Sequence, residues 1–236
     1  MINIKNLSMS LEEKKILDDI NIEVIKGSVY GLVGKNGAGK TTLINCISGI
    51  YRPTAGLINI NGQNPYNNHL LKQKIAYIPD EYSFNEGLKS NEIIYRFMKA
   101  YDCFDRNAYE RIIQLFELDD SKPARSMSKG MKTQLMLALK LATHPEILLM
   151  DEPTNGLDPL NQKIFFEVLV ELLLEQEMTV FISSHYIEGI EKICDCVGVI
   201  EKGKMIFEDS LDHIKDMNWS FIETITDTMK RGYYEQ

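Results

Sequence analysis

The chain has 236 residues, of which 44% are hydrophobic and 25% are charged, so it can bury a substantial core and its composition excludes disorder as the main state. Its 26 Lys and Arg against 34 Asp and Glu give a net charge of −8, which excludes a general affinity for polyanions such as nucleic acid. The sequence has no apolar run long enough to span a bilayer and no signal-peptide pattern at its start, so we expect a cytoplasmic protein.

The first part of the chain predicts strands that lead into one helix. Short apolar and alternating runs over residues 2–33 are typical of β-strands. A glycine-rich loop follows, and the pattern over 41–50 predicts a helix. Two further short strands are expected at 57–60 and 75–78.

In the rest of the chain the spacing of apolar residues changes twice. Residues 84–142 show helical periodicity, and strand and helix patterns then alternate over 143–209, which is typical of a mostly parallel α/β sheet. Apolar residues at helical spacing predict a helical tail within 210–236. We therefore predict a single domain in which 1–83 and 143–209 form an α/β core and 84–142 form a helical insert.

A phosphate-binding loop is the clearest functional signal. The eight residues from Gly34 to Thr41 fit G-x-x-x-x-G-K-[ST] and lie between a predicted strand and a predicted helix. Glycines allow backbone N–H groups to surround a phosphate, Lys40 adds a full positive charge, and the hydroxyl of Thr41 can bind Mg²⁺. The alternative is a glycine-rich turn that happens to precede a helix.

Two acids follow an apolar strand pattern at residues 147–150. Asp151 and Glu152 should lie at the carboxyl edge of the sheet, where α/β proteins bind ligands. Asp151 could then bind Mg²⁺, and Glu152 could orient or deprotonate an attacking water. Taken alone, the pair could equally be solvated acids at a strand end.

Two further positions have both a structural and a functional interpretation. Ser128 precedes a strong helix pattern and is expected to cap it, and the same helix start could also bind a γ-phosphate. His185 follows the apolar run near 180–182 and could be an ordinary surface histidine or a phosphate contact.

Together these signals resemble the nucleotide-binding domain of ATP-binding cassette (ABC) proteins, over nearly all of residues 1–210. The resemblance implies a RecA-like P-loop NTPase core of the α/β class, with an N-terminal antiparallel β subdomain and a helical signature subdomain. It implies ATP hydrolysis with Mg²⁺. In this family two domains pair head to tail, and the signature of one closes over the ATP bound to the other.

The resemblance also assigns roles to individual residues. Glu152 resembles the catalytic glutamate, His185 the switch histidine, and Asp158 the D-loop aspartate. The nucleotide-binding (Walker A) residues would be Gly34, Lys35, Asn36, Gly37, Ala38, Gly39, Lys40, Thr41 and Thr42. Mg²⁺ would be held by Thr41, Asp151 and Asp80, and the signature residues that meet the partner's ATP would be Ser128, Lys129 and Gly130.

The chain departs from the family pattern at four positions. Lys129 and Met131 replace a glycine and the glutamine of the usual signature, in a form that resembles many small bacterial exporters. Asp80 stands where the family usually has a glutamine, and its carboxylate can still approach Mg²⁺. Leu11 stands where an aromatic residue usually stacks on adenine, so we expect weaker discrimination between bases.

Aromatic residues are frequent in the predicted helical insert and have two interpretations. They could pack inside the insert, or some could line a groove that receives a short helix of a membrane partner. The eight aromatics are Tyr82, Phe84, Tyr95, Phe97, Tyr101, Phe104, Tyr109 and Phe116.

The resemblance implies an ATPase subunit that energises export through a separate integral membrane permease. The chain would lie on the inner face of the membrane and pair with a second nucleotide-binding domain, identical or different, without binding nucleic acid. Two alternatives remain open: a non-transport ABC ATPase, and a weakly hydrolysing regulatory module suggested by Asp80 and the unusual signature.

Overall fold

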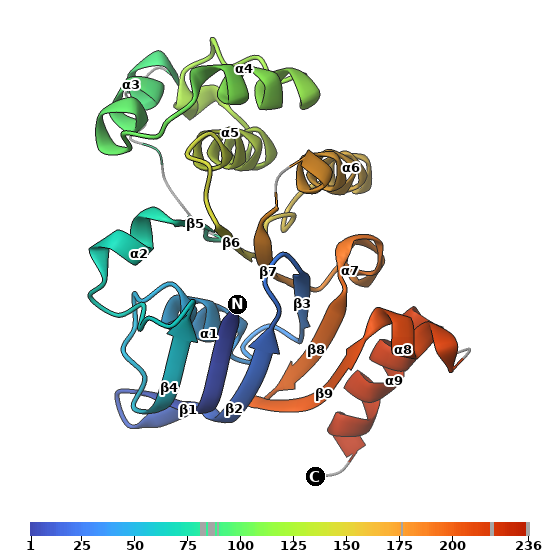
Figure 1. Cartoon of the computed structure of the whole chain (residues 1–236). Helices are drawn as coiled ribbons and strands as arrows, with labels where there is room; N and C mark the ends of the chain where they lie inside the picture. Colours follow the sequence, from blue (N-terminus) through green and yellow to red (C-terminus); the bar gives the residue numbers. More distant parts are fainter. Residues whose placement is uncertain (81–83, 85–87, 89, 176, 218–219, 235–236) are drawn as a thin grey trace.

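The computed structural model describes the chain except residues 81–83, 85–87, 89, 176, 218–219 and 235–236. Its main sheet has the strand order β5-β6-β7-β3-β8-β9 (Figure 1). The first five strands of that order run parallel and β9 is antiparallel to β8. The strands are β3 (Val29–Val33), β5 (Ile75–Ile78), β6 (Ile147–Asp151), β7 (Thr179–Ser184), β8 (Cys196–Glu201) and β9 (Lys204–Ser210).

A smaller antiparallel sheet in the order β2-β1-β4 lies beside the main sheet (Figure 1). Its strands are β1 (Ile2–Leu11), β2 (Lys14–Val24) and β4 (Ala55–Ile60). The mostly parallel main sheet and this N-terminal antiparallel sheet confirm the predicted fold class.

Strand alternation divides the buried residues between two cores. In β6, Ile147 and Leu149 belong to the core shared with the small sheet, whereas Leu148 and Met150 belong to the core under the helices. Successive side chains of a strand point to opposite faces, so a strand that is apolar throughout must be covered on both sides. This explains why β6 has no polar face in its sequence.

Helices cover the main sheet and form a lobe at one end of it. The lobe contains α3, α4 and α5 and lies away from the small sheet, while α8 and α9 lie beside β8 and β9 (Figure 1). The helices are α1 (Lys40–Ile47), α2 (His69–Gln73), α3 (Ser90–Ala100), α4 (Arg106–Leu115), η1 (Ala124–Ser126), α5 (Lys129–Leu141), α6 (Pro159–Glu175), α7 (Ile187–Ile193), α8 (Leu211–Asp216) and α9 (Phe221–Tyr234). None of the helices in the described part of the chain has the length and apolar character required to cross a membrane.

Some boundaries differ from the sequence prediction. α1 ends at Ile47 rather than near residue 50, because Gly49 adopts a left-handed φ of 70° and a Cβ there would lie 2.2 Å from the carbonyl oxygen of Pro65. Strand β9 was not predicted, because its residues are half-exposed at the edge of the sheet and lack a strong apolar pattern. The predicted tail contains two helices, with Phe221 and Ile225 of α9 buried in the larger core. Trp219 and residues 235–236 lie outside the described residues.

Most aromatics of the helical lobe pack inward. Phe84, Tyr109 and Phe116 are buried in the larger core, and the partly buried Phe97 and Phe104 pack against it. Tyr95 differs, because 60% of it is exposed. Tyr82 lies outside the described residues.

Candidate nucleotide-binding site

The main sheet brings the candidate residues together at one edge. Strand β7 lies between β3 and β6, and all three run parallel. Their carboxyl ends therefore meet at the same edge of the sheet. The loop that begins at Gly34 follows β3, Asp151 and Glu152 stand at the end of β6, and His185 follows β7.

The glycine-rich loop takes a conformation that only glycines adopt easily. Gly37 and Gly39 have φ values of 80° and 111°, and Gly39 begins helix α1 without a side-chain cap. A Cβ at Gly39 would lie 2.8 Å from Cδ2 of Leu17, so the small sheet also closes on this position. The cap residue of α1 therefore offers its first N–H groups no side-chain acceptor, at the place where a phosphate would bind.

Lys40 points back along this loop. It is 5% exposed, and its Nζ donates to the carbonyl oxygens of Gly34 at 2.5 Å and Lys35 at 3.1 Å. The same Nζ lies 3.1 Å from Oε1 of Glu152. The structure thus joins the glycine-rich loop and the acids after the apolar strand, two signals far apart in the sequence, through one buried ion pair.

Asp151 carries a buried oxygen that no described group satisfies. Its side chain is 1% exposed, and Oδ1 accepts a hydrogen bond of 2.6 Å from the Ser183 hydroxyl, while Oδ2 has no hydrogen-bond partner among the described residues. Burial raises the pKa of Asp151, and the nearby hydroxyls of Ser183 and Thr41 oppose this rise. A buried carboxylate with one unpaired oxygen beside a threonine hydroxyl suits a hard cation.

Glu152 is held between two basic side chains. Its Oε2 accepts a hydrogen bond of 3.1 Å from the backbone N–H of His185 and lies 2.6 Å from Nδ1 of the same histidine. Glu152 itself has a left-handed φ of 47°, and its N–H donates to Oγ of Ser183 at 3.0 Å. The carboxylate is buried, whereas the His185 side chain is 51% exposed and can reach a ligand outside.

Ser183 was missed by the sequence analysis. Its hydroxyl donates to Asp151 and accepts from the backbone N–H of Glu152, so it orients both acids. The signal in the sequence was a hydroxyl residue near the end of an apolar strand, two residues before the candidate histidine.

Ser128 caps helix α5, as predicted. Its Oγ accepts a hydrogen bond of 3.2 Å from the N–H of Met131. A Cβ at Gly130 would lie 2.5 Å from Cδ2 of Leu157, so the start of α5 packs closely on the loop between β6 and α6. In that loop Asp158 accepts hydrogen bonds of 3.1 Å from the N–H groups of Leu160 and Asn161 and so stabilises the start of α6.

Asp80 and Lys129, two of the departures from the family pattern, contact each other. Nζ of Lys129 donates to Oδ1 of Asp80 at 2.8 Å. Nδ2 of Asn155 donates to both oxygens of Asp80, at 3.1 and 3.2 Å.

Leu11, the fourth departure that the sequence shows, is the last residue of β1. Its surface is 37% exposed, which leaves it free to contact a ligand.

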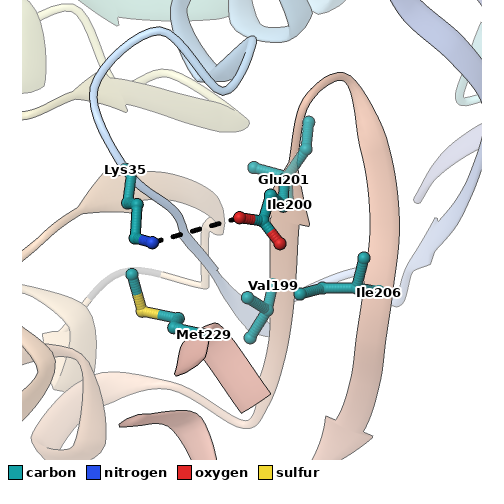
Figure 2. A pocket seen from close by; sticks show the side chains of 6 residues that line it. All are labelled: Lys35, Val199, Ile200, Glu201, Ile206 and Met229. Atoms are coloured by element: carbon teal, nitrogen blue, oxygen red, sulfur yellow. Dashed lines mark ion pairs between the residues drawn. The ribbon is translucent and has the colours of Figure 1, made fainter. Parts of the chain in front are cut away.

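The flank of the glycine-rich loop meets the C-terminal helix. Figure 2 shows Lys35 above a pocket lined by Val199, Ile200 and Met229, with Glu201 opposite its ammonium group. Nζ of Lys35 lies 4.0 Å from Oε1 of Glu201. The volume accessible in this pocket is about 10 Å³, so it is a packing gap rather than a ligand site.

Solved structures share the fold of this chain. The ATP-binding subunit of an ABC transporter superposes with a TM-score of 0.83 at 28% identity, over 97% of this chain and 99% of that one. The ATP-binding cassette MJ0796, solved as a dimer in a post-hydrolysis state with ADP and Pi, has a TM-score of 0.79 at 21% identity and covers 89% of this chain and 99% of its own. At that identity the second likeness shows the fold alone.

Proteins of similar sequence are also ATP-binding proteins of transporters. Bacitracin transport ATP-binding protein BcrA of Bacillus licheniformis is 35% identical over 94% of this chain and 74% of its own length. Lantibiotic transport ATP-binding protein SrtF of Streptococcus pyogenes is 33% identical over 94% of this chain and 96% of its own. A family model described as ABC transporter matches residues 17–155. The chain therefore belongs to the ABC transporter family and is an ATP-binding ATPase cassette of that family.

Proposed function

We propose that the chain energises an exporter, in which two cassettes close head to tail over ATP and act on a separate membrane permease. The observation that carries the catalytic part is the position of Glu152, between Lys40 of the phosphate-binding loop at 3.1 Å and His185 at 2.6 Å. A buried carboxylate with a cation on one side and an imidazole on the other supports a role as the base that activates water.

The donor set also supports binding of Mg²⁺ with the nucleotide. Asp151, whose Oδ2 is buried without a partner among the described residues, and Thr41 would hold the ion. Asp80 is not needed for this, since both of its oxygens accept hydrogen bonds from Lys129 or Asn155. When bound, the ion neutralises part of the phosphate charge.

The chain's own residues would then perform the following steps. Lys40 exchanges its hydrogen bonds to the carbonyl oxygens of Gly34 and Lys35, and its ion pair with Glu152, for contacts with the β- and γ-phosphates. Glu152 takes a proton from the water that attacks the γ-phosphorus, and the bond between that phosphorus and the β-phosphate bridging oxygen breaks to leave ADP. His185, which is half-exposed, contacts the γ-phosphate while Glu152 orients its ring.

The names of the relatives support a cargo class. BcrA is named for bacitracin transport and SrtF for lantibiotic transport, and the chain matches 96% of the length of SrtF. We therefore propose a peptide antibiotic as the exported cargo, with the chain attached to its permease at the inner face of the membrane. The second cassette of the pair can be identical or different.

The central test replaces the proposed base. With Glu152→Gln, hydrolysis should fall by about 10²-fold or more, while MgATP should convert the protein to a stable dimer in size-exclusion chromatography with light scattering. Glu146→Gln is a matched control, because this exposed acid precedes the same strand and pairs with Lys74 away from the site. Unchanged hydrolysis by Glu152→Gln would remove the proposed base.

A second test addresses transport. Cells that express the chain together with its membrane permease should tolerate bacitracin or a lantibiotic better than cells that express the Glu152→Gln variant with the same permease. Equal tolerance, together with a pull-down that recovers no integral membrane protein, would favour the non-transport ABC ATPase instead.

A further inference from the structure

We propose that Asp80 is a positioning residue for Lys129: it holds this lysine in the resting chain and releases it to the triphosphate of a facing cassette. The inference rests on the proposed head-to-tail pairing and goes beyond it, since it gives Asp80 a task other than metal binding. The residues concerned, Asp80, Lys129 and Asn155, are called the Asp80 cluster below.

Three separate segments of the chain build the Asp80 cluster. Asp80 follows β5, Lys129 is the first residue of α5, and Asn155 lies in the loop between β6 and α6. The Lys129 ammonium lies 2.8 Å from Oδ1 of Asp80, and the Asn155 amide donates to both oxygens of Asp80 at 3.1 and 3.2 Å. Both carboxylate oxygens of Asp80 therefore have donors.

Lys129 needs an anion at the place where it stands. A cation in the first turn of a helix is opposed by the partial positive charge of the helix N-terminus. The first turn of α5 contains no acidic residue of its own, so Asp80 is the anion that compensates Lys129. The stem of Lys129 also lies across the neighbouring loop, because a Cβ at Gly156 would be 3.5 Å from Cδ of Lys129.

This ion pair is weak enough to exchange. The side chains of Lys129 and Asp80 are 42% and 30% exposed, and pairs this exposed to water add little to stability. A triphosphate offers Lys129 several charged oxygens in place of one carboxylate oxygen, and charge-assisted hydrogen bonds to phosphate are strong. A facing nucleotide should thus displace Asp80 from Lys129.

The contact between Asp80 and Lys129 also explains why the chain departs from the family pattern at both positions. A glutamine at position 80 would carry no charge to compensate Lys129, and a glycine at position 129 would leave Asp80 without its cation. The acid at 80 and the lysine at 129 are therefore a matched pair, and changing one should change the effect of the other.

The test measures ATP-driven dimerisation in the Glu152→Gln background by sedimentation over a range of protein concentrations. Lys129→Met should raise the dissociation constant of the dimer about ten-fold, because a phosphate contact is lost. Asp80→Asn should lower this constant about three-fold, because Lys129 is no longer compensated. When Asp80→Asn is added to Lys129→Met, the dissociation constant should stay at the value of Lys129→Met alone. Lys132→Met, one turn later on the same helix, is the matched control and should dimerise normally.

Calorimetry with MgATP separates this inference from the proposed function. Both Asp80→Asn and Lys129→Met should bind MgATP as well as their parent, because the Asp80 cluster acts on the facing nucleotide. If the parent dimerises with ATP and Lys129→Met does so equally well, the inference fails and the proposed function stands. If Asp80→Asn weakens MgATP binding with or without Lys129, Asp80 acts on the chain's own nucleotide and the inference is overturned. A parent that binds no MgATP or forms no dimer overturns both.

Discussion

Nδ1 of His185 lies 2.6 Å from Oε2 of Glu152, so the half-exposed histidine reaches outward from a buried carboxylate. The backbone N–H of His185 donates to the same oxygen at 3.1 Å, which fixes the two residues relative to each other. The Glu152 carboxylate thus orients the imidazole.

Loss of this imidazole should slow hydrolysis more than it weakens binding. We expect His185→Ala to lower the hydrolysis rate about 10²-fold and to change the affinity for MgATP by less than about three-fold, because the ring acts on charge that develops during the reaction. Steady-state phosphate release and calorimetry measure the two effects. His213→Ala is the control, since His213 is also an exposed histidine, 2.7 Å from the carboxylate of Asp209. Equal losses in both variants would contradict the assigned role.

The buried ion pair between Lys40 and Glu152 should stabilise the nucleotide-free protein. Lys40→Met leaves the buried Glu152 carboxylate with His185 as its remaining basic neighbour, which should cost about 2 kcal/mol in the free energy of unfolding. For a chain of this length that corresponds to a fall of roughly 4–8 °C in melting temperature. Adding Glu152→Gln to Lys40→Met should recover part of the loss. Thermal unfolding without nucleotide checks this, and an unchanged melting temperature for Lys40→Met would show that the pair contributes nothing.

Base discrimination should improve when an aromatic ring is placed at position 11. Leu11 offers apolar contact but no stacking surface, so Leu11→Tyr should raise the ratio of ATP to GTP affinity by about five-fold. Competition between the two nucleotides for a fluorescent analogue measures the ratio. Leu57→Tyr places the same ring on an exposed residue of the same small sheet and should leave the ratio unchanged. Equal ratios for Leu11→Tyr and the unmodified chain would exclude contact between position 11 and the base.

The four cysteines should differ sharply in reactivity. Burial raises the pKa of Cys196 to about 11 and that of Cys46 to about 12, and it raises the pKa of Cys194 well above its usual value. The thiolate is the reactive form, so at pH 8 about one in a thousand Cys196 side chains is reactive, rising about ten-fold per pH unit. Cys103 is exposed, so maleimide labelling of the native protein should show one fast thiol that Cys103→Ser removes. Two or more fast thiols in the folded protein would contradict the core packing.

The parts of the site that a sequence reveals are those built from neighbouring residues. The loop from Gly34 to Thr41 and the acids at the end of β6 were predicted because a short motif and an apolar run fix their local geometry. The alternation of strand and helix patterns likewise predicted a mostly parallel sheet.

Contacts between distant segments were not predictable in the same way. The pairing of Asp80 with Lys129 joins residues 49 positions apart, and that of Lys40 with Glu152 depends on β7 lying between β3 and β6. Neither the charge of these side chains nor their spacing in the chain specifies such partners. Ser183 was overlooked for the same reason, since the two acids that it contacts lie at the end of the neighbouring strand β6.

Calorimetric titration of MgATP into the Glu152→Gln variant, with the Lys40→Met variant alongside, tests the central claim most directly. The account predicts saturable heat for Glu152→Gln and at least about a ten-fold weaker affinity for Lys40→Met, because one ammonium group and the surrounding backbone N–H groups bind the phosphates. No heat at millimolar MgATP, or equal affinities for the two variants, would contradict it.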